Sequence, residues 1–373
     1  MGLEVLKFGG SSVANAARMM HVAEIVSRHI TSGNRVVVVT SAMHGVTNQL
    51  IELTKQFCSP CHNREYDAVI SSGEQVAAGL LSMCLCSAGI PAKSFNAWQI
   101  PILAGGEFSN SSISSVCCDK ILGELDAGVV PVITGFQGIN DGAICTIGRG
   151  GSDATACAVA NSIDADRCFI YTDVDGVYTA DPRISIDCRR LDAISYDEMY
   201  ELSLCGATVL QARSVLAAKK YGIEISVVSS FSDGGGTVVA DSTSYVSTKW
   251  KIAGIAHHSG VTVATVKKQG DICERCLASD ALFIRRISDN KYIIPQSIKG
   301  ECNADYDDDV GLVTMVGRDL GNCAGLTEEA ISSLSSQSIS TKATLCGELS
   351  VSLVVPRLQT ELAVNTIHKM IFG

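Results

Sequence analysis

Short apolar runs rich in β-branched residues alternate with longer segments of helical periodicity over about the first 230 residues, and this alternation restricts the fold most strongly. Residues 35–41 (RVVVVTS) and 129–136 (VVPVITGF) are almost wholly apolar, as is typical of strands covered on both faces. Between such runs, apolar residues recur at three- and four-residue spacing, for example over residues 14–31. We therefore expect an α/β domain over residues 1–240, with three layers and a mainly parallel sheet.

The individual elements follow from the same patterns. The expected strands cover residues 3–8, 35–41, 91–95, 129–136, 167–172 and 223–229, with a hairpin over 138–147. The expected helices cover residues 14–31, 47–57, 71–88, 119–127, 197–205 and 207–221, and one more follows a glycine loop within residues 148–163. Residues 58–63 and a Gly- and Ser-rich stretch up to about 115 are expected to be irregular.

The composition changes at residues 233–247, which are rich in Gly, Ser and Thr and predict a hinge. The region 241–373 that follows is different in kind. Its second part, about 308–373, has a strand, a helix, one or two strands and a final helix, at 310–316, 327–337, 345–355 and 358–372, an order typical of ferredoxin-like α+β folds. Its first part, about 252–305, has strand-like pieces at 261–266, 281–287 and 292–295 but little helix. We therefore expect this part to be a shortened or atypical copy of the same ferredoxin-like fold.

The overall charge and hydrophobicity restrict the class of protein. The formal net charge of −10 argues against non-specific nucleic-acid binding, which requires a basic surface. No window approaches the ~18 consecutive apolar residues of a membrane span, and the start of the chain lacks the pattern of a signal peptide. We therefore expect a cytoplasmic enzyme that acts on small molecules and binds neither membrane nor nucleic acid.

The chain contains 16 cysteines, which we interpret as reduced and mostly buried. Two pairs, Cys58/Cys61 and Cys273/Cys276, have the local spacing of metal ligands. The pairs lie far apart in sequence, and neither has the compact second pair of a zinc ribbon. We therefore predict no protein-held metal site.

Lys7 ends the first apolar run and is followed by Gly9, Gly10 and Ser11. Because glycine has no side chain, backbone N–H groups in such a turn can approach phosphate oxygens closely. The pattern predicts a phosphate clamp, although taken alone it equally fits a lysine exposed at a strand end. The usual P-loop motif GxxxxGK[ST] is absent from the sequence.

Three further loops follow expected strands, at residues 41–47, 149–153 and 172–183. Because ligands lie beyond the carboxyl ends of parallel strands, these loops and the Lys7 turn could share one crevice. In the second loop, Arg149 can bind a carboxylate through both its nitrogens, and the helix start offers N–H donors to an anion. Asp153 in that first helical turn can instead serve only to favour the helix dipole.

Two acidic patterns are ambiguous in the same way. Glu74, after Ser71-Ser72-Gly73, can bind an ammonium group or merely occupy a helix start. The carboxylates of residues 172–178 (TDVDGVY) lack the spacing and the terminal glutamate of an EF-hand. We therefore favour a turn that contacts nucleotide over a calcium loop.

Together these motifs resemble one family. The segments are KFGGSSV at 7–13, SAMHGVTNQL at 41–50, SSGEQVAAGLL at 71–81, GFQG at 135–138, IGRGGSDATA at 147–156 and TDVDGVYTADPR at 172–183. In this order they resemble aspartate kinases of the amino-acid kinase superfamily, and the similarity extends from residue 3 to about 240. Residues 310–317 (VGLVTMVG) resemble the ACT-type regulatory domains of that family.

The resemblance implies phosphorylation of the side-chain carboxylate of L-aspartate by ATP with Mg²⁺, giving 4-phospho-L-aspartate on the route to lysine, methionine, threonine and diaminopimelate. It implies that Lys7 bridges the phosphates and that Asp153 orients the reacting groups. The implied aspartate contacts are Ser41, Thr47, Glu74, Arg149 and Ser152. The implied nucleotide contacts are Lys7, Gly9, Gly10, Ser11, Thr172, Asp173, Tyr178 and Arg183.

The sequence departs from the family pattern in two places. Residues 206–210 read GATVL, so Thr208 replaces a lysine that touches ATP in the family. The first regulatory copy is eroded, which bears on whether lysine or threonine acts as effector. A homodimer is expected from pairing of the ACT-type regions. Two alternatives stay open: a kinase for glutamate or N-acetylglutamate, and a catalytically weak partner that senses an amino acid.

Overall fold

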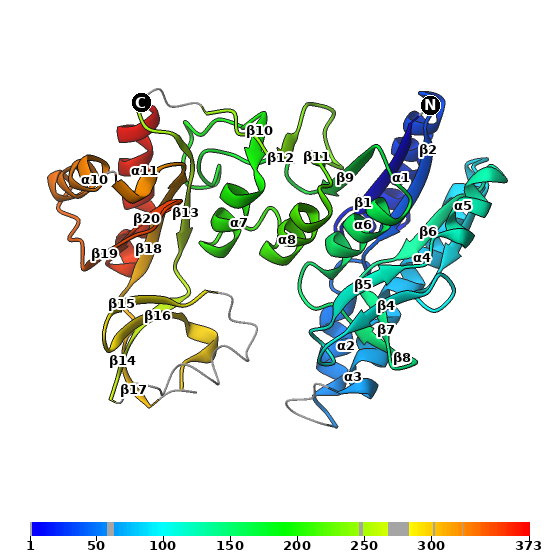
Figure 1. Ribbon diagram of the computed structural model, residues 1–373, viewed down its shortest axis with the longest axis horizontal. Helices are drawn as coiled ribbons and strands as arrows, with labels where there is room; N and C mark the ends of the chain where they lie inside the picture. The colour runs from blue at the N-terminus through cyan, green and yellow to red at the C-terminus, as the bar shows by residue number, and fades with distance from the viewer. Residues whose placement is uncertain (1, 58–62, 246–248, 268–282, 301–302, 323) are drawn as a thin grey trace. The chain divides into compact units, whose positions relative to one another are not determined.

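The computed structural model describes the chain except for residues 1, 58–62, 246–248, 268–282, 301–302 and 323 (Figure 1). Its contacts divide the chain into two compact units. Unit 1 consists of Met1–Gly176 and Arg213–Ala240, and unit 2 of Val177–Ala212 and Asp241–Gly373. Each unit is described by itself below. Unit 2 thus includes a stretch of about 36 residues that precedes the expected boundary at 240 in sequence.

Unit 1 is built on a mainly parallel sheet, as the alternating pattern predicted. Its strands run in the order β12-β11-β9-β1-β2-β6-β3, and all these pairs are parallel except β11 with β12. The strands are β1 Leu3–Phe8, β2 Arg35–Thr40, β3 Ala92–Phe95, β6 Val130–Thr134, β9 Arg167–Thr172, β11 Ile225–Ser229 and β12 Thr237–Ala240.

Helices cover both faces of this sheet. On one face, α1 (Ala16–Thr31) and α4 (Ser72–Ser87) bury a cluster that includes Leu6 and Phe8 of β1. On the other face, α6 (Gly151–Ser162) lies against β1. Side chains alternate in direction along a strand, so Lys7 points to the face opposite Leu6 and Phe8 and meets α6. The three-layer α/β prediction is confirmed for this unit. The remaining helices of unit 1 are α2 Val46–Thr54, α3 Arg64–Ile70, α5 Asp119–Asp126 and α8 Ala212–Tyr221, whose first residue belongs to unit 2.

A small second sheet in unit 1 corrects the expectation of an irregular stretch up to about 115. Its order is β5-β4-β7-β8, with β4 Ile102–Gly105, β5 Ser112–Val116, β7 Gln137–Asn140 and β8 Ala143–Thr146. The expected hairpin supplies β7 and β8. Strand β4 is only four residues long and β5 is rich in serine, and they are stabilised by pairing of β4 with β5 and with β7. Their local sequence therefore carried no strand signal.

Helix α3 was also not expected, and a buried carboxylate holds it. Asp67 is fully buried, and its two oxygens accept hydrogen bonds from Ser109 N at 2.8 Å, Ser109 Oγ at 2.7 Å, Thr146 N at 2.6 Å and Thr146 Oγ1 at 3.1 Å. Asp67 thus joins α3 to β8 and to the loop around Ser109. Because these donors lie 42 and 79 residues away in sequence, no local pattern revealed the helix.

Unit 2 contains a ferredoxin-like sheet with the order β13-β18-β20-β19. Strands β18 (Gly311–Gly317), β19 (Ala343–Cys346) and β20 (Ser350–Val355) alternate with α10 (Ala324–Ser336) and α11 (Thr360–Phe372), as predicted (Figure 1). Strand β13, Ile252–His258, was not predicted and lies beside β18 in antiparallel register. Strand β13 thus lies in the range expected for the first regulatory copy, about 252–305, and completes the sheet of the second.

The rest of the first regulatory copy forms a separate sheet with the order β15-β16-β14-β17. The strands are β14 Val261–Val266, β15 Arg285–Ser288, β16 Lys291–Pro295 and β17 Ala304–Asp307. The strand predicted over 281–287 begins outside the described residues. Cys273 and Cys276 also lie outside them. The small cluster on this sheet includes Ala264, Val266, Ile294 and Ile298.

Unit 2 also includes β10 (Ala193–Ser195) and helix α7 (Tyr196–Leu204), which lies against β13 and β18. The helix expected over residues 207–221 begins only at Ala212, so residues 207–211 are not helical. The break follows from Gly206, whose φ of 113° lies in a region that other residues rarely adopt. This backbone conformation ends α7 and keeps the chain from continuing as a helix.

One helical stretch, Arg64–Ser87, is long and apolar enough by composition to cross a membrane, and 44% of its most apolar window is buried inside the protein. A core helix can have the same length and composition, so this is weak evidence for a span. No other helix in the described ranges passes this test.

We expect Asp67→Asn to destabilise the protein by about 2–3 kcal/mol, because the new amide would face hydrogen-bond donors in a buried site. Urea unfolding of the variant and wild type measures this difference. Asp126→Asn is the matched control, since its ion pair with Arg35 is exposed and should contribute little. Equal midpoints for all three proteins would contradict the anchoring role of Asp67.

Candidate active site

Three of the four loops singled out in the sequence start from one edge of the unit 1 sheet, whereas the loop at 149–153 follows β8 of the small second sheet. Lys7 of β1 lies opposite Val39 of β2 and Ile170 of β9 in parallel register. Strands β1 and β2 both end at the next pair, Phe8 with Thr40. The loops after β1, β2 and β9 therefore begin side by side, as the topology predicted.

Lys7 and Asp153 form a buried ion pair at this edge. The distance from Lys7 Nζ to Asp153 Oδ1 is 2.5 Å, and the two side chains are 9% and 11% exposed. Asp153 lies in the first turn of α6. The interpretation of Lys7 as a solvated strand-end residue is therefore wrong. Because both charges are shielded from water, their interaction is stronger than that of a surface pair.

The glycine turn after Lys7 packs closely against the loop after β2. A Cβ atom on Gly10 would lie 2.9 Å from the carbonyl oxygen of Ala42, so no larger residue fits there without a shift. The carbonyl of Gly10 accepts a hydrogen bond of 3.1 Å from His44 N, and Gly9 N donates to Tyr171 O at 3.1 Å. Ser11 is half-buried within this turn. The turn is thus held in place by backbone contacts on both sides.

Glu74 is a buried carboxylate with one unsatisfied oxygen. It lies in the first turn of α4 and is 3% exposed. Its Oε1 accepts a hydrogen bond from Ala42 N at 3.1 Å, while Oε2 finds no donor among the described residues. Desolvation raises the pKa of Glu74 to about 7. A buried acceptor without a protein donor is rare in folded proteins, and it can be satisfied by an ordered water, an ion or a ligand.

The close approach that brings Glu74 to Ala42 depends on the preceding residue. A Cβ atom on Gly73 would lie 2.9 Å from Ala42 Cβ and 3.2 Å from Val46 Cγ1. Helix α4 therefore contacts the loop after β2 directly through its glycine.

The other expected aspartate contacts also lie in unit 1. Ser41 is half-buried and donates its N–H to Phe8 O at 3.1 Å. Thr47 is half-buried in the first turn of α2, and Ser152 is 8% exposed in the first turn of α6. Arg149 is exposed in the loop that leads into α6.

Arg213 was not identified from the sequence, although it holds the loop before Arg149. Its guanidinium donates to the carbonyl of Ile147 and to the side-chain oxygen of Asn110, and Nη1 lies 3.5 Å from Ser111 O. It is a lone basic residue near a helix start, a pattern too common to indicate such a role.

The expected nucleotide contacts are distributed over both units. Thr172 donates its hydroxyl to Asp173 Oδ1 at 3.1 Å in unit 1. In unit 2, Arg183 forms an ion pair of 2.7 Å with Asp181 and thereby holds the pKa of that carboxyl below its usual value. Tyr178 of unit 2 forms an isolated β-bridge with Arg190. Thr208 is exposed and lies before α8, not within it as expected.

No group of three or more His, Cys, Asp or Glu side chains that could hold a metal ion occurs among the described residues. Cys58 and Cys61 lie outside those residues, as does the second cysteine pair. Cys157 and Cys168 are buried together, and the hydrogen bond with Cys168, with burial as a second cause, raises the pKa of the Cys157 thiol well above its usual value.

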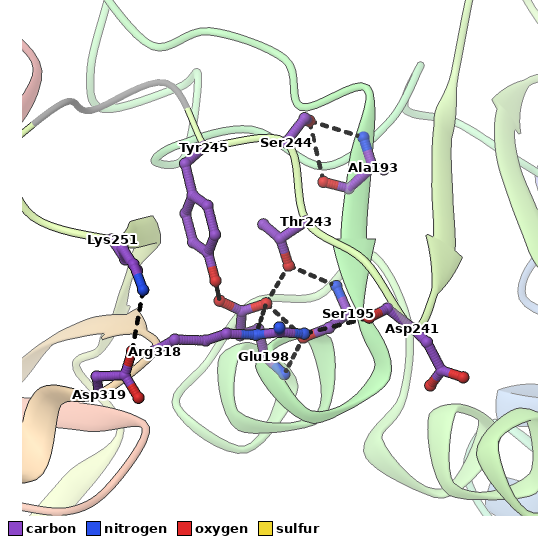
Figure 2. Close-up of polar contacts among 10 residues, drawn as sticks. All are labelled: Ala193, Ser195, Glu198, Asp241, Thr243, Ser244, Tyr245, Lys251, Arg318 and Asp319. Carbon is purple, nitrogen blue, oxygen red and sulfur yellow. Dashed lines mark hydrogen bonds and ion pairs between the residues drawn. The ribbon is translucent and has the colours of Figure 1, made fainter.

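A further buried carboxylate, Glu198 of α7 in unit 2, was not identified from the sequence, and Figure 2 shows the side chains around it. Tyr245 OH donates to Oε1 at 2.6 Å, and the hydroxyls of Ser195 and Thr243 donate to Oε2. Arg318 Nε lies 3.9 Å from Oε2. This cluster fastens the segment after residue 240 to α7. A capping box, Ser195 with Glu198 three residues later, was the signal that could have found it.

Comparison with known proteins places this architecture in a family. The model of the amino acid kinase family matches residues 2–229. An aspartate kinase of Pseudomonas putida is 36% identical, and the alignment covers 99% of this chain and 97% of that protein. An aspartokinase of Mycolicibacterium smegmatis is 34% identical, with coverage of 99% and 96%.

Solved structures have the same fold over the whole chain. E. coli aspartokinase III in complex with aspartate and ADP has a TM-score of 0.82 at 22% identity, with both chains fully covered. The same enzyme in complex with lysine and aspartate has a TM-score of 0.78 at 24% identity, again with full coverage of both chains. These likenesses concern the fold, and the sequence comparisons give the family. The chain belongs to the amino acid kinase family, among its aspartate kinases.

Proposed function

We propose that this protein transfers the γ-phosphoryl group of ATP to the side-chain carboxylate of L-aspartate, giving 4-phospho-L-aspartate. This is the first step toward lysine, methionine, threonine and diaminopimelate. The observation that carries the proposal is the buried Lys7–Asp153 pair beside the glycine turn, at the edge where the loops after β1, β2 and β9 begin. The identity of 36% to an aspartate kinase over nearly the whole chain supports the same activity.

The reaction suits a site of this composition. A substrate carboxylate with a pKa near 4 is ionised at neutral pH, so it needs no general base to attack phosphorus. The difficulty is that two anions must approach each other, and catalysis therefore depends on positioning and charge neutralisation. Lys7 is the buried cation of this edge, and Asp153 orients its ammonium group toward the phosphates.

The glycine turn complements Lys7. We propose that the backbone N–H groups of Gly10 and Ser11 bind phosphate oxygens and that Gly9, whose own N–H donates to Tyr171 O, lets the phosphates approach closely. Mg²⁺ that arrives with ATP neutralises further phosphate charge and needs few protein ligands. The described residues fit this role, because they offer single carboxylates such as Asp153 near the turn and no cluster of three ligands.

Aspartate recognition is assigned to the second set of loops. The unpaired Oε2 of Glu74 is placed to accept the substrate ammonium group. Arg149 is the candidate partner of the α-carboxylate, since guanidinium binds carboxylate with two parallel hydrogen bonds. Hydroxyl groups of Ser41, Thr47 and Ser152 are proposed to donate further hydrogen bonds.

The nucleotide is assigned to Thr172, Asp173, Tyr178 and Arg183. Thr208 is neutral at a position where the family has a cation, so Lys7 and the N–H groups take a larger share of charge neutralisation. We further propose a homodimer in the cytoplasm, with residues 241–373 as an ACT-type regulatory region. Lysine or threonine is the proposed effector, and lysine is bound by E. coli aspartokinase III.

Lys7→Ala should lower kcat by at least about 10²-fold, because removing one transition-state donor has that effect in other enzymes. Coupled ADP release measures turnover, and calorimetry should find aspartate affinity unchanged. Lys93→Ala is the control, since Lys93 is an exposed lysine paired with Glu124. A kcat close to wild type in a folded Lys7→Ala protein would make Lys7 structural.

Aspartate use should depend on the ionisation of Glu74, whose pKa is raised to about 7. As the pH falls below this value, Glu74 protonates and loses its attraction for the substrate ammonium group. We therefore expect kcat/KM for aspartate to fall roughly tenfold per pH unit below about pH 7. Glu74→Gln should have a low kcat/KM without this acid limb, whereas Glu65→Gln, an exposed acid of α3, should keep the wild-type profile. An acid limb that persists in Glu74→Gln would assign it to another group.

Substrate choice separates the remaining alternatives. We expect phosphorylation of L-aspartate to exceed that of N-acetyl-L-glutamate by at least about 10²-fold in kcat/KM, because N-acetylation removes the ammonium group and leaves Glu74 unpaired. L-Glutamate keeps its ammonium group and is longer by one methylene, so we expect it to be slower than L-aspartate by about 10-fold or more. The coupled assay with each acceptor measures these ratios. Faster turnover of N-acetyl-L-glutamate would indicate the related kinase, and binding of amino acids without any turnover would indicate a regulatory partner.

A further inference from the structure

Part of the proposed nucleotide turn lies inside the hydrophobic core of the ferredoxin-like sheet. Ala180 is 3% exposed and belongs to a cluster with Ile252 and Ile255 of β13, residues of β18 and β20, and several residues of α11. It lies between Tyr178 and Arg183, the two proposed nucleotide contacts of unit 2. The middle of the turn therefore packs in the core of the ferredoxin-like sheet.

Thr179, beside Ala180, has polar contacts on three sides and is fully buried. Its carbonyl accepts a hydrogen bond from Ile255 N of β13 at 2.8 Å. Its Oγ1 accepts from Arg189 N at 3.0 Å and lies 2.9 Å from His368 Nε2 of α11. Because Oγ1 has one hydrogen and already accepts from Arg189, the hydroxyl is free to donate to His368.

His368 is suited to accept this hydrogen bond. It is 3% exposed, and burial lowers the pKa of its imidazole, so the ring is neutral at physiological pH and one nitrogen is an acceptor. Its ring contacts Phe372 with centroids 4.8 Å apart. The packing fixes the ring, and with it the direction of Nε2.

The same helix contacts the far side of the turn. Asn365 Nδ2, one helical turn before His368, donates to Ile184 O at 3.1 Å. Helix α11 therefore holds the segment at Thr179 and again at Ile184, and Arg183 lies between these two points.

We infer that His368 is a positioning residue for the nucleotide: through its hydrogen bond with Thr179, the C-terminal helix of the regulatory region fixes the turn that presents Tyr178 and Arg183. The inference rests on the proposed nucleotide role of those two residues. It makes nucleotide affinity depend on a helix that carries none of the proposed substrate contacts.

The test uses the full-length protein and ADP as the probe. His368→Leu removes the acceptor and leaves the Thr179 hydroxyl without its partner, and Thr179→Val removes the donor while keeping the shape. For each variant we expect the ADP dissociation constant to rise about tenfold while that of aspartate changes less than twofold. The double variant should be no weaker than Thr179→Val alone, because that substitution already removes the interaction with His368, together with the acceptor for Arg189 N.

Three further variants separate positioning from loss of stability. His368→Gln retains a hydrogen-bond acceptor and should recover much of the ADP affinity. Leu334→Val, a fully buried substitution of α10 in the same cluster, should lower thermal stability without the selective loss of ADP binding. Lys369→Ala, the exposed neighbour of His368, should match wild type in both respects.

Hydrogen exchange gives a readout that does not depend on activity. Amides of residues 177–184 should exchange faster in His368→Leu than in Leu334→Val at matched stability. Unchanged exchange there, unchanged ADP affinity, or fully additive effects in the double variant would overturn the inference. Failure of the proposed function can be distinguished from failure of this inference. A wild type that binds ADP without phosphorylating aspartate would contradict the function, but the ADP affinities of the variants could still be compared.

Discussion

The parallel pairing of β1 with β2 and β9 determines the rest of unit 1. It places Lys7 between Val39 and Ile170 and directs its side chain toward α6, where Asp153 lies 2.5 Å away. Side chains alternate along a strand, so a slip of one residue would turn Lys7 into the apolar cluster under α1 and α4. The cost of burying that charge unpaired makes this register strongly preferred.

Buried carboxylates have two different roles in this protein. Asp67 and Glu198 have hydrogen-bond partners on both oxygens, and each joins segments distant in sequence. Glu74 has a donor on one oxygen and none described on the other, so its burial is incompletely compensated and its pKa rises to about 7. A fold tolerates such a group where a ligand supplies the missing donor. Asp67 and Glu198 therefore stabilise the fold, whereas Glu74 is the acid proposed to recognise substrate.

Unit 2 combines segments that the sequence presents as separate. Strand β13 comes from the range expected for the first regulatory copy but pairs with β18 of the second, and Ala180 from the proposed nucleotide turn enters the same core. The hydrogen bond between Thr179 and His368 therefore joins residues 189 positions apart. Hydrogen bonding and core packing therefore connect the regulatory region directly to the segment that contains residues proposed to bind nucleotide.

The sequence by itself determined the α/β class, most strands of the main sheet and the loops that carry the proposed site, because apolar periodicity and glycine turns are local signals. Only the tertiary structure decided the burial of Lys7, the unpaired oxygen of Glu74, the place of β13 and the existence of α3. Each of these depends on atoms contributed by remote segments, such as Ser109 and Thr146 around Asp67. Desolvation and hydrogen-bond pairing arise only when those segments meet, so no local pattern encodes them.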